Sequence, residues 1–480
     1  MTIQIRNLVA VLAVALTLTV GATAHDTPTV NIGKTFIAAS LDPGKGSTGW
    51  ALTAHGVSEN LYTVDRRGRL VPNLAKSIRT IDDHTFRVTL AAGRRFADGT
   101  PVDAAAVAAA LMRTTQLSGR ARATSGKLTA SAVNPATVEI RTEKAVPLPA
   151  AMLAEWAMVI YKVAGDTFVF TGPYDVAKVG PGEAMKLVPN PHYPDAETRP
   201  VINLRKFSDP QALTIALESG ELDMAFGLPV ESLNRLKARQ EVTVKSFQVA
   251  YQYMMIFNTE RAPLNDPALR RAIDLAIDRN QLALAVNGGT PATGAYSAYF
   301  PFAIKGARPF DPPAAAKILD AAGWKTGPDG MRVKDGKPLA LTLYAYPQRP
   351  DLLTFQPVIK AMLAKIGVGV ETRVTDNIGA LAKSGDFDLT LCATNTAPSG
   401  EPSFFLNAFL RQGTGYNHAR YKSAEFGAVV DKMTQTRDAA ARMKLAAEAH
   451  DVLFRDVPVS FLLTPDWHVG LSPRLAGYEP

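Results

Sequence analysis

The chain has 480 residues, which is more than one hydrophobic core usually serves and suits two or three domains at roughly 150 residues each. Hydrophobic residues make up 47% and charged residues 20%, and these ordinary values exclude a disordered chain and a polytopic membrane protein. The net charge is +8, with basic and acidic residues interspersed, and the single cysteine, Cys392, excludes an intramolecular disulfide. We expect a soluble, multi-lobed protein that binds no nucleic acid.

The first 24 residues have the pattern of an export signal. One cation, Arg6, precedes an apolar run over residues 8–20, and small residues follow, ending at Ala24. The run of 13 residues is shorter than the ~17 to 25 that anchor a chain across a bilayer. We therefore predict cleavage after Ala24 and a mature chain in the periplasm.

Strand-like and helix-like patterns alternate along the mature chain. Residues 85–91 and 340–345 alternate as β-strands do, whereas the alanine-rich residues 102–112 have the pattern of a helix that Asp103 caps. This interleaving predicts an α/β protein.

Two apolar stretches, residues 249–258 and 459–464, have the character of strands that cross between lobes. They predict a hinge of two crossing strands, with lobe I at 25–252, lobe II at 253–460 and a return to lobe I at 461–480. Such a layout makes a cleft whose walls close on a ligand.

Charged residues follow one another in the segment 269–279. Arg270, Arg271 and Arg279 share this segment with Leu269 and Ile273, which suggests a helix with one apolar and one charged face. We interpret these residues as structural and assign them no ligand contact.

Enzyme and nucleotide-binding signatures are incomplete. Gly44, Gly46 and Gly49 satisfy GxGxxG, but Pro43 stands where a tight strand-to-helix turn is needed. The seven histidines include no HExxH pair, and the chain has no GxSxG motif. We expect a protein that is not an enzyme; an exported hydrolase that uses scattered carboxylates is the remaining enzyme alternative.

Many short motifs along the chain resemble those of one family, the extracytoplasmic solute-binding proteins of the peptide and nickel class, family 5. Each motif is weak alone, but their order and spacing are specific. They lie at residues 41–43, 59–62, 70–77, 96–104, 171–174, 218–223, 257–258, 268–273, 276–279, 321–324 and 442–456.

The resemblance implies a periplasmic binding protein fold of type II, in the large class that carries an extra subdomain on lobe I, here at about 62–170. It also implies a function: the chain captures a small solute, closes around it and delivers it to the permease and ATPase of an ABC importer. We expect a monomer with no permanent cofactor.

The segment 394–399 bears on the ligand. In dipeptide-binding relatives an aspartate near this turn pairs with the ligand's ammonium group, but here the segment contains no acid and Glu401 stands in the turn itself. A buried ammonium without a carboxylate costs several kcal/mol. The segment therefore weakens the hypothesis of a dipeptide or oligopeptide receptor. We keep that hypothesis as the alternative to a chelate receptor.

Relatives that bind nickel as a small chelate carry one histidine in a later loop, and His418 holds this place here. Imidazole is a suitable nickel ligand, and one histidine suffices when the chelator fills the other positions. The resemblance also implies that arginines bind the carboxylates of the ligand. Arg120 or Arg122 is the first candidate for this role, and Arg411 is the second. A second arginine that those relatives carry after Trp156 is missing.

The remaining candidate contacts are aromatic and polar, with core packing as the alternative for each aromatic ring. They are Trp50, Tyr251, Tyr253, Tyr416, Asn395, Thr396 and Asn417. The sequence thus favours a receptor for a nickel chelate, formed with histidine or an opine-type metallophore, in which His418 completes the metal's coordination.

Overall fold

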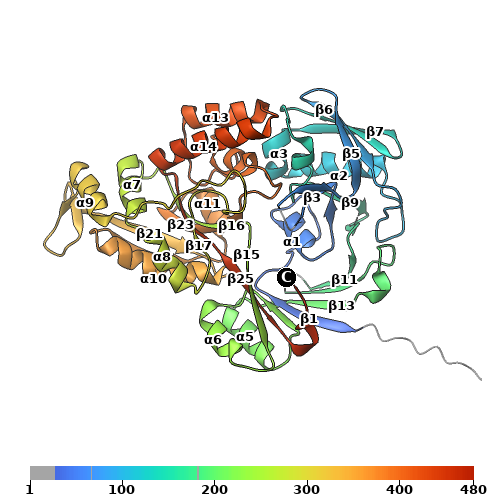
Figure 1. The fold of residues 1–480 in the computed structure, drawn as a ribbon, viewed down its shortest axis with the longest axis horizontal. Coiled ribbons are helices and arrows are strands. Elements are labelled where there is room, and N and C mark those ends of the chain that lie inside the picture. The colour runs from blue at the N-terminus through green and yellow to red at the C-terminus, as the bar shows by residue number, and fades with distance from the viewer. Residues whose placement is uncertain (1–27, 66–67, 181–182, 480) are drawn as a thin grey trace, which may run out of the picture.

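The computed structural model describes residues 28–65, 68–180 and 183–479, so the predicted export signal and its cleavage site after Ala24 lie outside the described residues. Two α/β lobes lie side by side and meet near the centre of the molecule (Figure 1). Lobe I combines residues from distant parts of the chain, whereas lobe II is one continuous stretch.

A seven-stranded mixed sheet forms the base of lobe I. In spatial order its strands are β11 (Tyr174–Gly180), β12 (Ala184–Pro189), β13 (Val201–Lys206), β1 (Thr29–Lys34), β14 (Met224–Phe226), β25 (Asp466–Leu471) and β15 (Thr243–Gln248). Strand β1 is parallel to β13 and β14, whereas β25 is antiparallel to β14 and β15. Helices α5 (Pro210–Glu218) and α6 (Leu233–Lys237) contribute buried leucines to the core beneath it.

A second layer of lobe I is built on a four-stranded antiparallel sheet, seen at the upper right of Figure 1. Its strands, in spatial order, are β5 (Ala75–Thr80), β6 (Thr85–Leu90), β8 (Thr137–Thr142) and β7 (Leu128–Asn134). Helix α2 (Ala104–Leu117) packs on β7, and the Asp103 carboxylate caps it by accepting a hydrogen bond of 2.8 Å from the Ala106 N–H. The predicted strand at 85–91 and the predicted cap are thus confirmed.

Further short elements complete lobe I. They are α1 (Thr48–Ala54), β2 (Glu59–Asn60), β3 (Tyr62–Val64), β4 (Leu70–Pro72), α3 (Gly119–Ser125), α4 (Pro149–Met152), β9 (Val159–Ala164), β10 (Thr167–Phe170), η1 (Ala196–Thr198) and η2 (Val230–Ser232). Strands β10, β9 and β2 form a small sheet of their own.

Lobe II is built on a six-stranded sheet. In spatial order its strands are β17 (Thr290–Pro291), β24 (Val459–Thr464), β16 (Tyr251–Phe257), β23 (Leu389–Asn395), β21 (Ala340–Ala345) and β22 (Gly369–Val374). Strand β21 has the bounds that the sequence predicted. Along β16 alternate residues enter different cores, since Tyr253 and Met255 join one cluster and Met254 and Ile256 another.

Helices cover both faces of this sheet (Figure 1). The lobe also has a small extension, which is a three-stranded antiparallel sheet. The helices are α7 (Pro267–Leu275), α8 (Arg279–Ala285), α9 (Pro312–Ala321), α10 (Pro350–Ala364), α11 (Ile378–Ser384), α12 (Ser403–Phe405), α13 (Ala424–Gln435) and α14 (Ala439–Asp456). The extension consists of β18 (Lys325–Thr326), β19 (Arg332–Lys334) and β20 (Lys337–Pro338).

The chain crosses between the lobes twice. It leaves lobe I after β15 and enters lobe II with β16, and it returns at Pro465, between β24 and β25. The expected two-lobed α/β fold with two crossing segments is confirmed. The proposed domain boundaries differ in detail, because residues 251–252 and 461–464 pair within the sheet of lobe II and not within lobe I.

The charged segment at 269–279 is not one helix with a solvated face. It forms the end of α7 and the start of α8, and both Arg270 and Arg279 are only 4% exposed. Arg270 donates hydrogen bonds to the backbone carbonyls of Asp456, Val457 and Leu264. These hydrogen bonds join α7 to a segment far away in the sequence. The expectation that these residues are structural agrees with this role, whereas the expected single helix is divided into α7 and α8.

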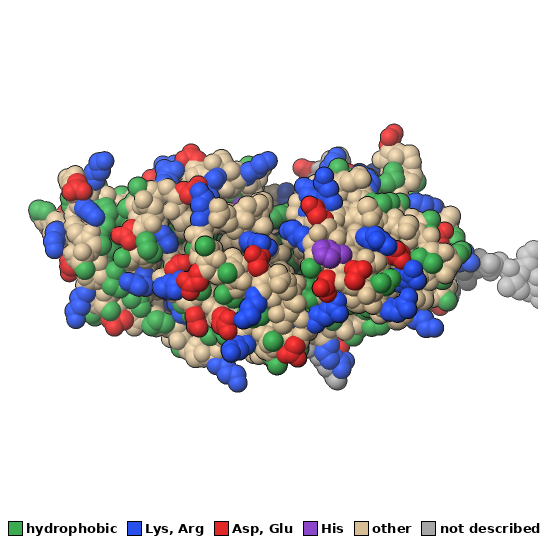
Figure 2. Space-filling model, turned by 90° about the horizontal axis from the view of Figure 1, so that it is seen from above, with side chains coloured by type: hydrophobic (Ala, Val, Ile, Leu, Met, Phe, Trp, Pro, Cys, Tyr) green, Lys and Arg blue, Asp and Glu red, His purple; other side chains and the backbone are tan. Residues whose placement is uncertain are grey.

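Positive and negative side chains intermingle on the face of the molecule that Figure 2 shows. Within the described residues, no helix combines the length and the apolar character that are needed to cross a bilayer.

Candidate ligand-binding site

One buried cation between the lobes is Arg120, on helix α3 of lobe I. The residue is 7% exposed, and among the described residues its Nε has no hydrogen-bond partner. Its guanidinium carbon lies 4.2 Å from the ring centroid of Trp156, and 4.7 Å and 4.9 Å from those of Tyr416 and Phe409 in lobe II. Aromatic faces stabilise a cation without neutralising it, so Arg120 is available to an anion that enters between the lobes.

His418 lies in lobe II, in the loop between η3 (Leu406–Leu410) and α13. It lines a small apolar pocket together with Cys392 and Tyr416. Burial lowers the pKa of His418 to about 4, and the charges of Arg120 and Arg420 act in the same direction. The imidazole is therefore neutral at neutral pH, and its lone pair is available to a metal. Burial also raises the pKa of the Cys392 thiol to about 11, so this residue stays protonated.

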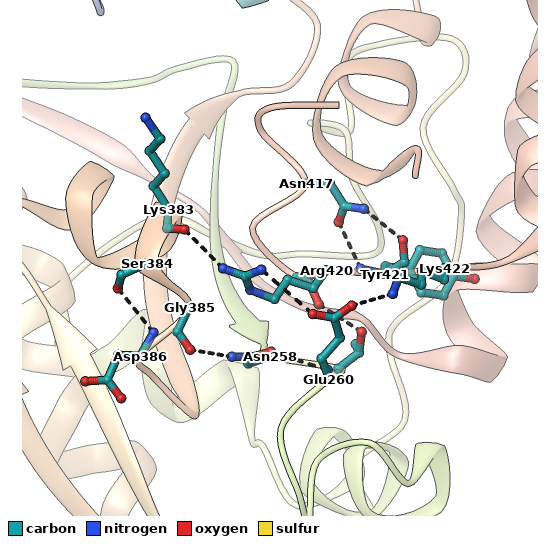
Figure 3. A network of polar contacts seen from close by, with 12 residues as sticks. Asn258, Glu260, Lys383, Ser384, Gly385, Asp386, Asn417, Arg420, Tyr421 and Lys422 are labelled. Carbon is teal, nitrogen blue, oxygen red and sulfur yellow. Dashed lines mark hydrogen bonds and ion pairs between the residues drawn. The ribbon is translucent and has the colours of Figure 1, made fainter. Parts of the chain in front are cut away.

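The loop that carries His418 is held to the body of lobe II by a polar network (Figure 3). The Asn417 amide spans the loop, since its Nδ2 donates to the Tyr421 carbonyl at 2.8 Å and its Oδ1 accepts from the Tyr421 N–H at 3.0 Å. Glu260 forms ion pairs with Arg420 at 3.8 Å and with Lys422 at 2.5 Å. These contacts fix the backbone on both sides of the histidine.

A larger pocket of about 340 Å³ lies between the lobes, and one of its walls is Trp156, the ring that Arg120 faces. Trp50 and Trp156 line it from lobe I, and Tyr299, Phe300 and Asn395 line it from lobe II. Its size and aromatic walls suit a small organic ligand.

Arg349, at the start of helix α10 in lobe II, is a second cation at the interface. Its guanidinium carbon lies 5.4 Å and 5.3 Å from the ring centroids of Phe36 and Trp467, which belong to lobe I, and 5.7 Å from that of Tyr251. No motif marks the residues before α10, so the sequence does not single out Arg349. Its only sequence signal is a charged residue before a proline at a helix start.

The structure also brings an acid to the site that sequence reasoning did not anticipate. Glu155 is 2% exposed; its carboxylate accepts a hydrogen bond of 2.6 Å from the Thr124 hydroxyl, while Oε2 has no partner among the described residues. Burial raises the pKa of Glu155 to about 8, although the charge of Arg120 opposes this change. Glu155 is therefore largely neutral at neutral pH.

Four predicted site residues therefore gather around the cleft with Arg120 and His418, namely Trp50, Tyr251, Asn395 and Tyr416.

Two predicted arginines have partners elsewhere. The Arg122 guanidinium donates to the carbonyls of Thr115 and Gln116 at 2.8 Å each and so closes the end of α2. Arg411 forms an ion pair with Asp431 on α13. Both cations are satisfied within their own lobe, so neither is free to hold a ligand carboxylate.

Three further predicted residues contact other parts of the protein. Tyr253 is 2% exposed and donates a hydrogen bond of 2.8 Å to Asp351, and Asn417 bonds within its own loop. Thr396 is fully buried, and its hydroxyl has no hydrogen-bond partner among the described residues. These residues support the walls of the site, and Asn417 does so through the position of His418.

Within the part of the chain that the structure describes, no three His, Cys, Asp or Glu side chains are grouped so that they could hold a metal ion. His418 is thus a single candidate metal ligand.

Comparison with known proteins gives the family and the fold. Residues 69–417 match the family described as bacterial extracellular solute-binding proteins, family 5. The nickel-binding protein NikA of Staphylococcus aureus is 22% identical over 433 residues, which cover 88% of this chain and 86% of that protein. The probable D,D-dipeptide-binding periplasmic protein DdpA of Escherichia coli is 25% identical, over 85% of this chain and 81% of that protein.

The structure also resembles solved structures. NikA from Staphylococcus aureus in complex with Ni(L-His)2 superposes with a TM-score of 0.83 at 20% identity, covering 93% of this chain and 95% of that one. This likeness concerns the fold, and it agrees with the two-lobed arrangement described above. Since the family match extends over most of the chain and the fold agrees with it, this protein belongs to the bacterial extracellular solute-binding proteins of family 5.

Proposed function

We propose that this protein is the binding component of an ABC importer and captures a small nickel chelate, formed with histidine or an opine-type metallophore. The observation that carries the proposal is a neutral buried imidazole, His418, whose pKa is influenced by the buried cation Arg120, for which the described residues supply no ion pair. Imidazole nitrogen suits nickel, and a guanidinium suits the carboxylates of a chelator. The relative that binds nickel supports this ligand class.

The chelate is expected to bring most of its own nickel ligands. His418 supplies one nitrogen, and the aromatic residues Trp50, Trp156 and Tyr416 offer flat surfaces to the organic part. We propose that the ligand is bound without chemical change and without a permanent cofactor.

The family supports a role outside the cytoplasm. We propose that the chain is exported, is cleaved after Ala24 and acts in the periplasm as a monomer that delivers its ligand to a permease and its ATPase. The intermingled charges on the face in Figure 2 are unlike the basic patches that bind nucleic acid, which supports a small-molecule partner.

Calorimetry with purified protein tests the metal role. Nickel with two equivalents of L-histidine should bind to the wild type, and His418→Ala should weaken this binding by about tenfold or more, since a metal–ligand bond is lost. His192→Ala, which removes an exposed histidine, is the matched control and should bind as the wild type does. Equal affinity in His418→Ala and in the wild type would rule out coordination by His418.

One observation favours a second ligand class, a short peptide. Glu155 and Arg120 place an acid and a cation near each other in the site, and an ammonium group beside Glu155 would favour the ionised carboxylate with which an amine pairs. The dipeptide-binding relative supports this alternative. Native mass spectrometry of the purified protein distinguishes the two classes, because a peptide receptor should retain peptides, and a chelate receptor should retain none.

A further inference from the structure

Helix α3 of lobe I has two buried faces, and they belong to the cores of different lobes. Ala121 joins the apolar core of lobe I, whereas Ala123 joins a core of lobe II, whose other buried members run from Met254 to Phe461. Two residues along a helix turn the side chain by roughly 200°, so the two alanines lie on opposite faces of α3. The helix thus packs into both lobes, on the side of lobe I that faces lobe II (Figure 1).

The end of α3 is bonded to lobe II through the backbone. The last carbonyls of a helix have no partner within it, and that of Ala123 is one of them, because the Lys127 N–H donates instead to Glu143 at 2.8 Å. The Ala123 carbonyl accepts two hydrogen bonds of 2.9 Å, one from Lys144 Nζ in lobe I and one from Asn407 Nδ2 in lobe II. Asn407 is only 3% exposed, so its hydrogen bond joins the two lobes in a buried setting.

The π-helix η3 supplies this amide, and its residues are all buried. Phe409, in the same turn of η3, lies with its ring centroid 4.9 Å from the guanidinium carbon of Arg120. Arg120 precedes Ala123 by three residues, so the two lie on one face of α3. η3 therefore holds this face at two points, and both contacts are made between groups of the protein itself.

The hydrogen bond between Asn407 and Ala123 favours the closed arrangement by a modest amount. When the lobes separate, water replaces each partner, and the net effect of one such bond is about threefold to tenfold in an equilibrium constant. This is enough to bias a two-state equilibrium without fixing it. The ion pair of 2.6 Å between Arg437 and Asp83 also joins the lobes, but it is exposed and contributes less.

We infer that the contact between α3 and η3 is a latch that favours closure before a ligand binds, and that Asn407 is a positioning residue of the binding site. Asn407 acts through α3, because it holds the helix that carries Arg120. The effect on ligand affinity rests on the proposed function, in which Arg120 binds a ligand anion, whereas the effect on the ligand-free protein does not.

Small-angle scattering of the ligand-free protein tests the latch. Asn407→Ala removes the donor, and Asn407→Asp keeps the shape of the side chain but turns an acceptor toward the Ala123 carbonyl. Both variants should have a larger radius of gyration than the ligand-free wild type, because the ratio of closed to open molecules falls about threefold to tenfold. The matched control is Asn190→Ala, which removes a fully buried amide bonded to the Gly172 carbonyl at 2.9 Å within lobe I and should leave the radius unchanged.

Stopped-flow tryptophan fluorescence with nickel and two equivalents of L-histidine tests the positioning role. Both Asn407 variants should bind about threefold to tenfold more weakly than the wild type, mainly through faster dissociation, because the closed complex loses a contact that the open protein lacks. Asn190→Ala should dissociate at the wild-type rate.

Circular dichroism and melting temperature establish that each variant is folded. Equal radii of gyration in the folded Asn407 variants and in the ligand-free wild type overturn the inference, as do equal affinities for the nickel complex. Expansion of the Asn407 variants, combined with a wild type that does not bind the nickel complex, supports the latch and contradicts the nickel proposal.

Discussion

At the scale of single residues, His418 illustrates how burial prepares a metal ligand. A histidine in water is half-protonated near pH 6.5, so a proton competes with a metal just below neutral pH. In this protein burial and two nearby arginines lower the pKa of His418 to about 4. The side chain therefore needs no deprotonation before it binds nickel at pH 7.

This pKa predicts a flat pH profile for the contribution of His418. Because the imidazole is neutral above about pH 5, the ratio of wild-type to His418→Ala affinity for the nickel–histidine complex should stay constant between about pH 7 and about pH 5. It should fall only as the pH approaches about 4, where the proton begins to compete. Calorimetry of both proteins across this range measures the ratio, and a midpoint near pH 6.5 would contradict the burial argument.

At the scale of elements, the His418 loop depends on a neighbouring helix end. Gly385, which ends α11, has a φ of +76°, and a Cβ there would collide with the Arg420 guanidinium. Arg420 itself has a φ of +54° and donates to the Lys383 carbonyl at 3.1 Å (Figure 3). The end of α11 therefore sets where the loop can lie.

Gly385→Ala should displace Arg420 and weaken nickel–histidine binding while also lowering stability by about 1 kcal/mol or more, because the left-handed backbone disfavours alanine. The matched control is Gly427→Ala on α13, where a Cβ meets no atom within 4 Å. That substitution should keep affinity and slightly raise stability, since alanine favours a helix. Calorimetry and urea unfolding give both quantities. Unchanged affinity in Gly385→Ala would show that the loop position does not depend on α11.

A second element-scale feature is the buried charge network between α7, α8 and β24. Asp274 is 3% exposed and pairs with Arg279 at 2.5 Å and with Arg308 at 3.0 Å. Arg279 also donates to the Phe461 carbonyl at 2.6 Å, which ties the helices to the strand that returns toward lobe I. The network thus anchors the hinge side of lobe II.

Asp274→Asn should lower the free energy of unfolding by about 3 to 5 kcal/mol, because it leaves buried guanidinium groups without an acid. Asp386→Asn breaks an exposed ion pair with Arg261 and should cost about 1 kcal/mol or less. Urea unfolding of the two variants gives the comparison. Similar losses in both would mean that the buried network contributes little more than a surface pair.

At the scale of the whole molecule, two arginines reach across the interface between the lobes, one from each side. Arg120 extends from lobe I toward the aromatic rings of Phe409 and Tyr416 in lobe II, and Arg349 extends from lobe II toward Phe36 and Trp467 in lobe I. The closed arrangement therefore brings each cation into the opposite lobe.

A ligand that contacts both lobes in the cleft should make the molecule more compact. Addition of the nickel–histidine complex should decrease the radius of gyration in small-angle scattering and change the tryptophan fluorescence, since Trp50, Trp156 and Trp467 lie at the interface. Arg349→Gln should reduce both changes at equal occupancy. Binding without any change in scattering or fluorescence would contradict closure.

Much of the fold was accessible from the sequence, because local patterns decide it. Alternation marked β6 and β21, a capping aspartate marked the start of α2, and two apolar runs marked the crossings between lobes. Hydrophobic periodicity and helix capping act over a few residues, so a sequence displays them directly.

The partners and the burial of the charged side chains could not be predicted from local patterns. Arg270 and Arg279 have the sequence pattern of exposed helix residues, but they are buried because carbonyls from distant segments satisfy them. Arg122 and Arg411 have the same residue type as Arg120, and only their three-dimensional partners set them apart.

By itself, the sequence determined the α/β character, the two crossings and the family, since each depends on short-range pattern or on motif order, and it marked His418 as a candidate. The tertiary structure alone decided which cations are buried without an ion pair to any described carboxylate, Arg120 and Lys34 among them. The physical reason is that the energy of a charge depends on its surroundings in space, and neighbours far apart in the chain supply those surroundings.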